Sequence, residues 1–144
     1  SPWLVVKYIM LIKLIISFIF IILQIRLVFA DIVDVNNKEI IELLNANTPI
    51  VDVRRSFEWE QTGIIPNSIL LTFFDDEGNY NFDKWYEELR LELNVNDPII
   101  LICRSGNRSK IIAKMMDEKY DNKFYNAKNG IKSWINANLI TVKP

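Results

Sequence analysis

The 144-residue sequence contains no histidine and a single cysteine, Cys103. Without histidine the chain cannot build a Cys-His or Ser-His catalytic pair, nor the usual zinc or copper ligand sets. With one cysteine it cannot form an intramolecular disulfide, and it has no second thiol for dithiol-disulfide exchange. Any catalyst in this chain must therefore be activated by local electrostatics, and we expect no metal and no cofactor.

An excess of positive charge is also missing. Basic and acidic residues nearly balance, 17 against 18, but Lys7, Lys13 and Arg26 precede every acidic residue. From Asp31 onward the chain carries 14 basic residues against 18 acidic ones. This balance argues against a nucleic-acid-binding face, so we predict no nucleic-acid partner. The length, with half of the residues hydrophobic, is enough for one globular core.

The one long apolar stretch lies in the first thirty residues. Lys13 precedes an apolar run from Leu14 to Leu23, and a Val-x-Ala sequence ends at Ala30. A charged start, an apolar centre and a small residue at the end are the three regions of a secretory signal peptide. The sequence therefore predicts a signal peptide over residues 1–30, with Met10 as the natural start and cleavage after Ala30.

Two alternatives for this segment are a membrane anchor over residues 8–29 and a hydrophobic helix buried in the fold. Crossing a bilayer takes about 20 mainly apolar residues, and the uninterrupted run is roughly half that, which favours cleavage. Both the signal peptide and the anchor place Lys7 and Lys13 inside and the folded part outside the cytoplasmic membrane. We therefore predict an exported, periplasmic or extracytoplasmic protein, held at the inner membrane only if the segment is not cleaved.

In residues 31–144, short apolar runs alternate with segments of helical periodicity. Strands are predicted at 32–35, 49–53, 69–72, 98–103 and 123–125, and helices at 37–44, 57–61, 82–89, 109–119 and 131–135. This alternation predicts an α/β domain with a mainly parallel sheet of about five strands and helices on both faces. In such sheets ligands bind beyond the carboxyl ends of the strands.

Cys103 stands at that edge, as the last residue of a predicted strand. The loop from Arg104 to Arg108 follows it and leads into a predicted helix. The start of a helix carries backbone N–H groups without intrahelical partners and a partial positive charge. Gly106 can adopt a positive φ, which lets the loop turn its N–H groups inward. Together with Arg104 and Arg108, these features favour a reactive thiolate over a merely buried cysteine.

The heptapeptide Cys103-Arg104-Ser105-Gly106-Asn107-Arg108-Ser109 resembles the active-site loop of the rhodanese-like sulfurtransferases. Further similarities over residues 33–137 are Asp52-Val53-Arg54, Glu58-Trp59, Gly63-Ile64-Ile65-Pro66, Gly130 and Trp134. One departure is Ile64, where the family often has histidine. The resemblance implies a rhodanese-like domain over residues 31–144, of the single-domain thiosulfate sulfurtransferase kind.

By this resemblance, Cys103 takes a sulfane sulfur from thiosulfate or a similar anionic donor and holds it as a persulfide. It then passes the sulfur to a thiol or cyanide acceptor. Inward N–H groups of Ser105, Gly106, Asn107 and Ser109 would stabilise the anions, and Arg104 and Arg108 would orient the donor. A thiolate that attacks sulfur needs no neighbouring base, so the missing histidine is no obstacle.

Two other functions are compatible with the residues. Phosphatases and arsenate reductases of related folds use a Cys-x5-Arg loop, whereas Cys103 to Arg108 forms a Cys-x4-Arg loop. A non-catalytic rhodanese-like module that binds a protein partner is the second alternative, although inactive modules often lack the cysteine. We expect Arg54 to form a structural ion pair with Glu58 rather than to contact substrate.

Overall fold

The computed structural model describes residues 1–24, 32–120 and 123–144 of the chain. Five strands form one parallel sheet in the order β1-β5-β4-β2-β3. The strands are β1 (Ile32–Val35), β2 (Ile50–Asp52), β3 (Ile69–Leu70), β4 (Ile99–Ile102) and β5 (Phe124–Ala127). The helices are α1 (Pro2–Gln24), α2 (Asn37–Asn45), α3 (Ser56–Thr62), α4 (Phe82–Glu92), α5 (Asn107–Lys119) and α6 (Gly130–Asn136). The predicted α/β class with a five-stranded parallel sheet is confirmed.

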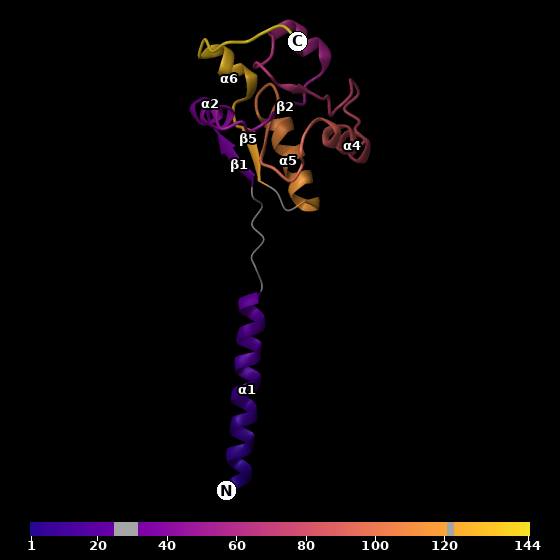
Figure 1. The fold of residues 1–144 in the computed structure, drawn as a ribbon. Coiled ribbons are helices and arrows are strands. Elements are labelled where there is room, and N and C mark those ends of the chain that lie inside the picture. Colours follow the sequence, from indigo (N-terminus) through magenta and orange to yellow (C-terminus); the bar gives the residue numbers. More distant parts are fainter. Residues whose placement is uncertain (25–31, 121–122) are drawn as a thin grey trace.

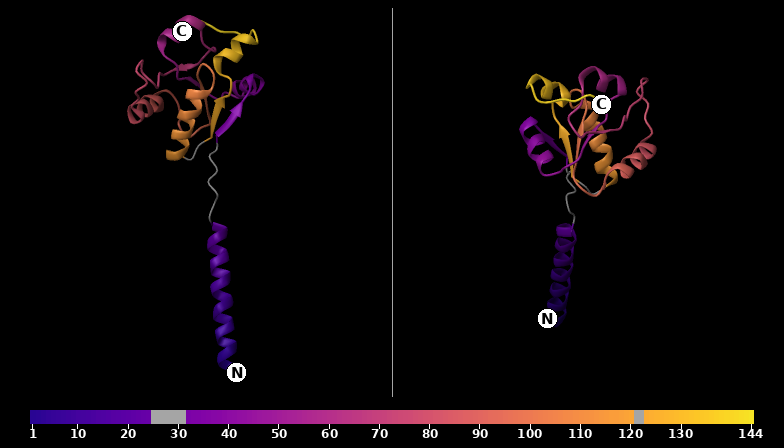
Figure 2. Two further views of the ribbon diagram at one scale, coloured as in Figure 1. Left: turned by 180° about the vertical axis from the view of Figure 1, so that it is seen from behind. Right: turned by 45° about the horizontal axis from the view of Figure 1, so that its top comes forward.

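Helices cover both faces of the sheet because the central strand is apolar on both sides. Ile99 and Leu101 of β4 lie in a core that includes residues of α4 and α5. Ile100 and Ile102 lie in a second core, with residues of α2 and α6. All four side chains are fully buried. Figure 1 and the two further views of Figure 2 show α2 and α4 on opposite sides of the strands.

The elements lie close to their predicted positions, and the differences are at their ends. The third strand has only two residues, Ile69 and Leu70, whereas four were predicted. The last strand continues to Ala127, two residues beyond the prediction. This extension includes Asn126 in the sheet, next to the edge that carries Cys103.

The N-terminal helix α1 is long and apolar enough over residues 2–22 to cross a membrane, and none of that stretch is buried in the structure. The interpretation as a buried core helix is therefore wrong. A signal sequence passes the same test of length and composition. The predicted cleavage site after Ala30 lies outside the described residues.

Candidate active site

Cys103 follows the last residue of β4, and the start of α6 fixes its backbone. The N–H of Ile131 donates to the carbonyl oxygen of Cys103 at 2.9 Å, and the N–H of Lys132 donates to that of Arg104 at 3.1 Å. Gly130 has a φ of +60°, and a Cβ there would clash with the Arg104 carbonyl group. The first turn of α6 can therefore approach the loop this closely only with glycine at position 130.

The sulfur of Cys103 lies inside the loop, with the residue only 1% exposed. The N–H of Gly106 donates to Sγ at 3.1 Å, and the hydroxyl of Ser109 lies 3.3 Å from it. Helix α5 begins at Asn107, and the N–H of Lys110 donates to the Gly106 carbonyl oxygen as its first intrahelical bond. The N–H groups of residues 107–109 therefore have no acceptor within the helix. This arrangement is suited to an anionic sulfur.

Gly106 makes this geometry possible. Its φ is +94°, in the left-handed region that glycine adopts without strain. A Cβ at this position would clash with the carbonyl oxygen of Lys128, in the segment after β5. The loop therefore packs closely against the segment that follows β5. Its conformation around Cys103 requires that residue 106 has no side chain.

Arg108 is tied to helix α3 by an ion pair. Its guanidinium donates to both carboxylate oxygens of Glu58, at 2.9 and 2.6 Å. Burial raises the pKa of Glu58, but the hydrogen bonds from Arg108 and from the backbone N–H of Arg55 outweigh it and bring the pKa to about 2. The hydrogen bonds between Arg108 and Glu58 also raise the pKa of Arg108. The pair therefore clamps the first turn of α5 to α3.

Arg54 is a structural residue, as expected, but its partner differs from the prediction. It is fully buried and donates through Nε and Nη2 to the carboxylate of Asp52, at 2.9 and 2.8 Å. It also donates to the hydroxyl of Thr62 at 2.7 Å and to the carbonyl oxygen of Gly63 at 3.0 Å. Only the backbone carbonyl of Glu58 contacts it, at 3.4 Å. The predicted ion pair of Arg54 with the Glu58 carboxylate is therefore wrong.

Arg104 is the exposed guanidinium of the loop. Within the described part of the chain, its side chain forms no hydrogen bond or ion pair. With Arg55, Phe57 and Gln61 it lines a hollow of about 400 Å³ between the loop and α3, together with Arg54, Glu58 and Thr62. Ser105 and Asn107 are exposed, whereas Gly106 and Ser109 are buried. The loop thus presents one free positive charge beside the buried sulfur.

Two polar residues that the sequence did not single out, Asn126 and Asp34, extend the hydrogen-bond network that begins at Cys103 and Ser109. Ser109 donates to Oδ1 of Asn126 at 2.6 Å, and Nδ2 of Asn126 donates to Oδ1 of Asp34 at 2.8 Å. Asn126 is 1% exposed. The signal available in the sequence was a polar residue between Tyr125 and Ala127, just after the predicted strand, but its partners depend on the pairing of β1 with β5.

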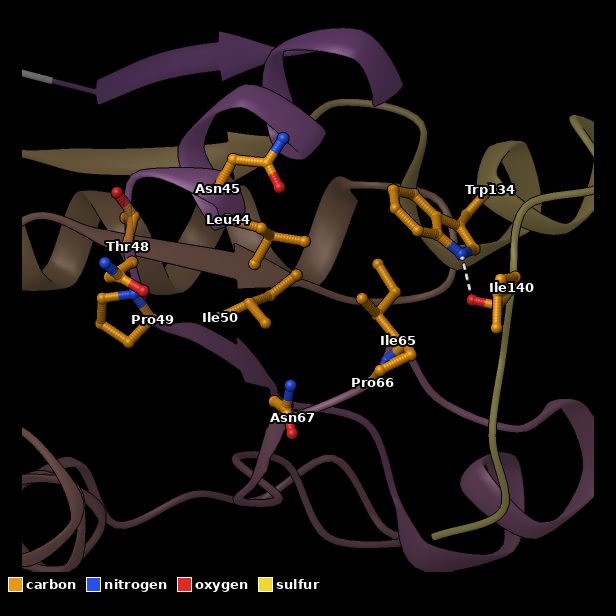
Figure 3. Close-up of a pocket in the computed structure, with 11 residues that line it drawn as sticks. Leu44, Asn45, Thr48, Pro49, Ile50, Ile65, Pro66, Asn67, Trp134 and Ile140 are labelled. Carbon is orange, nitrogen blue, oxygen red and sulfur yellow. Dashed lines mark hydrogen bonds between the residues drawn. The ribbon is translucent and has the colours of Figure 1, made fainter.

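A second hollow, of about 490 Å³, lies on the α2 and α6 face of the domain (Figure 3). Leu44, Ile50, Ile65 and Trp134 give it apolar walls, and Trp134 donates from Nε1 to the carbonyl oxygen of Ile140 at 2.9 Å. None of its described lining residues is ionisable. It therefore offers no acid, base or thiol.

A known family, a curated protein and a solved structure each show similarity to most of this chain. The rhodanese-like domain profile matches residues 36–137. An uncharacterized protein of Rickettsia prowazekii, RP600, is 32% identical over 105 residues, which cover 67% of this chain and 85% of that protein. The crystal structure of Rv0390 from M. tuberculosis matches 77% of this chain and 97% of its own, with 25% identity and a TM-score of 0.66.

A further solved structure is that of the polysulfide-sulfur transferase homodimer from Wolinella succinogenes. It matches 81% of this chain and 82% of its own, with 21% identity and a TM-score of 0.61. At this identity the match concerns the fold alone.

Proposed function

This chain belongs to the rhodanese-like domain family, and we propose that it is a sulfurtransferase that uses Cys103 to carry a sulfane sulfur. One observation carries the proposal. The sulfur of Cys103 accepts a hydrogen bond from the N–H of Gly106 at 3.1 Å, at the positive end of α5. Such a site stabilises a negative charge on sulfur, both on the free cysteine and on a persulfide.

The proposed donor is thiosulfate or a similar anion, and the reaction has two steps. In the first, the thiolate of Cys103 attacks the outer sulfur of the donor. The S–S bond of thiosulfate breaks, sulfite leaves with the electron pair, and a persulfide forms on Sγ. In the second, a thiolate or cyanide acceptor attacks the outer sulfur, and Cys103 leaves as a thiolate. Neither step requires a general base once the acceptor is deprotonated.

We assign the two loop arginines different parts in this reaction. The side chain of Arg104 is exposed and forms no hydrogen bond or ion pair within the described residues, so it can attract and orient the donor's oxygens. Both terminal nitrogens of Arg108 already donate to Glu58, so Arg108 acts mainly by holding the loop and by its charge. The N–H groups of Ser105, Gly106, Asn107 and Ser109 would surround the persulfide.

The same pairing of Arg108 disfavours phosphatase or arsenate reductase chemistry. A phosphoryl group needs donors positioned around three oxygens, and a loop arginine commonly supplies a bidentate pair. In this chain both terminal nitrogens of Arg108 already donate to the carboxylate of Glu58. The Cys-x4-Arg loop is also one residue shorter than the Cys-x5-Arg loop of those enzymes. A purely protein-binding role would leave the buried, hydrogen-bonded thiol of Cys103 without a purpose.

The test is thiocyanate production from thiosulfate and cyanide by the purified full chain in detergent. We expect activity in the parent and in Arg90→Ala, a control that changes an exposed side chain on α4, and none in Cys103→Ser, because a hydroxyl cannot form a persulfide. We expect no hydrolysis of aryl phosphates. Activity in Cys103→Ser would contradict the mechanism, and an inactive parent that hydrolyses aryl phosphates would favour the phosphatase alternative.

We also propose that the protein is exported, with residues 1–30 as a signal peptide or anchor and residues 31–144 as the catalytic domain. Strand β1 begins at Ile32, at the amino end of the sheet, whereas Cys103 lies at the carboxyl end. An uncleaved α1 would thus attach at the edge opposite to the site.

Fractionation of bacteria that express the chain, followed by N-terminal sequencing, tests this. A soluble periplasmic form that begins at Asp31 indicates cleavage, and an intact membrane-bound form indicates an anchor. An intact soluble form in the cytoplasm would contradict both.

A further inference from the structure

The hydroxyl group of Ser109 has one hydrogen and two acceptors within reach. Its oxygen lies 2.6 Å from Oδ1 of Asn126 and 3.3 Å from Sγ of Cys103. The shorter distance is that of a strong O–H···O hydrogen bond. A single hydrogen cannot serve both acceptors at full strength. The Ser109 hydroxyl is therefore shared between the reactive sulfur and a residue on the next strand.

Asp34 decides which end of the Asn126 amide faces Ser109. A carboxylate can only accept, so the amide nitrogen of Asn126 must point to Asp34, where it donates at 2.8 Å. Its oxygen consequently points to Ser109 and can only accept. The register of the parallel strands brings these two side chains together, because Asp34 of β1 lies opposite Asn126 of β5. Ser109 and Asn126 are buried, so water offers neither a substitute partner.

We propose that Asn126, oriented by Asp34, is a positioning residue that competes with the sulfur of Cys103 for the hydrogen of Ser109. While Cys103 is a thiol, its S–H can donate to the Ser109 oxygen and Ser109 can donate to Asn126, so every group has a partner. When the thiol releases its proton to water, the sulfur becomes an acceptor. Ser109 can then serve it only by leaving the buried oxygen of Asn126 without a donor.

This competition acts on the resting enzyme more than on the loaded one, an inference that rests on the proposed sulfurtransferase function. In the persulfide, the negative charge lies on the outer sulfur, and Sγ is bonded to carbon and sulfur. Ser109 can then return to Asn126 while the N–H groups of the loop serve the outer sulfur. Asn126 thus favours the thiol and the persulfide over the free thiolate, which limits side reactions of an unloaded Cys103.

The charged groups around this chain of hydrogen bonds come from β1, α5, α3 and the segment after β5. Asp34 on β1 is paired with Lys110 of α5 at 3.3 Å. The hydrogen bond from Asn126 is the main cause that lowers the pKa of Asp34, and Lys110 and Lys128 lower it further. Burial raises this pKa, but by less than the hydrogen bond lowers it. Arg108 of α5, which is paired with Glu58 of α3, is a further cation near this chain of hydrogen bonds. Replacement of Asn126 leaves these charged side chains in the protein.

The rate of alkylation of Cys103 by iodoacetamide, measured against pH on the full chain in detergent, tests the inference. In Asn126→Leu the Ser109 hydrogen is free for sulfur, and we expect the rate profile to shift, with alkylation about tenfold faster on its acid side. In a Ser109→Ala background the same replacement should change nothing, because Asn126 acts through Ser109. An equal shift in both backgrounds, or no shift in either, would overturn the inference.

Asp34→Asn is a second variant that tests the same role. It is needed because Asn126→Leu changes a buried residue and could alter the fold. The Asp34 side chain is one-third exposed, and an amide there can accept as well as donate, so it no longer fixes Asn126. We expect a smaller shift in the same direction that disappears with Ser109→Ala. A shift that persists without the Ser109 hydroxyl would reflect the lost charge and contradict the proposed role.

Alkylation needs no sulfur donor, so the two proposals can fail separately. If thiosulfate leaves Cys103 unmodified but the coupling to Ser109 is observed, the sulfurtransferase function falls and the positioning role stands. If sulfur is transferred but Asn126→Leu has no effect on alkylation, only the positioning role falls.

Discussion

The guanidinium of Arg108 donates to both carboxylate oxygens of Glu58, at 2.6 and 2.9 Å, although the two residues are 50 positions apart in the sequence. This pair joins α3 to the first turn of α5, the helix that follows the Cys103 loop. The ion pair therefore connects the loop around Cys103 to α3, and backbone hydrogen bonds from Ile131 and Lys132 connect the same loop to the first turn of α6. Several consequences of this arrangement can be measured.

The Glu58–Arg108 pair should make stability depend on pH. The pKa of Glu58 is about 2 in the folded protein, below its ordinary value of 4.5. The carboxylate therefore stabilises the fold fully above about pH 4.5, and this contribution is lost as the pH falls toward about 2. We expect Glu58→Gln to unfold at lower urea at neutral pH and to lose less stability on acidification than the parent. Parallel stability curves of the two proteins would contradict this.

The buried pair of Arg54 and Asp52 should be structurally essential. Arg54→Met leaves a fully buried carboxylate without its cation, which costs about 3–5 kcal/mol of unfolding free energy. Arg55→Met is the matched control, because the ion pairs of Arg55 are partly exposed and are worth at most about 1 kcal/mol. Urea unfolding measures both. Equal losses would show that burial of the pair is not the cause.

Gly106→Ala should displace the loop over Cys103. The new Cβ would clash with the Lys128 carbonyl oxygen, in addition to the strain of a φ of +94°. Gly78→Ala separates the two effects, since Gly78 has a φ of +83° but open space around it. We expect Gly78→Ala to cost about 1–2 kcal/mol of stability with sulfur transfer retained, and Gly106→Ala to abolish transfer. Full transfer in Gly106→Ala would show that this close approach is not required.

Arg104→Ala should weaken the use of anionic donors without affecting the fold, because the Arg104 side chain is exposed. We expect the KM for thiosulfate to rise about tenfold, with the melting temperature unchanged and partial recovery in Arg104→Lys. Arg90→Ala, which removes an exposed charge on α4, controls for net charge. A KM that rises equally in Arg90→Ala would point to a general charge effect.

The sequence was sufficient for the fold because the central strand β4 is a short run of β-branched and other apolar residues, and helical periodicity alternates with the strands on either side. It also placed Cys103 between strand and helix, since Gly106 and the loop arginines mark the turn. The ends of strands were less certain. Hydrophobic patterning does not say where a ladder of hydrogen bonds stops, and the polar Asn126 at the end of β5 falls outside an apolar pattern.

The partners of charged residues could not be predicted in the same way. An Arg54–Glu58 pair would suit the i, i+4 spacing of a helix, but Arg54 precedes α3, which begins at Ser56, so that spacing does not apply. Arg54 instead folds back on Asp52. Glu58 is then available to Arg108, through a contact that only the assembled sheet brings about.

Intact-protein mass spectrometry after incubation with thiosulfate detects the proposed persulfide on Cys103 itself. We predict that the chain gains the mass of one sulfur atom, that peptide mapping places this sulfur on Cys103, and that cyanide removes it. Cys103→Ser, treated in the same way, should gain nothing. A parent protein that remains unmodified, or a gain of sulfur that persists in Cys103→Ser, would contradict the proposed function.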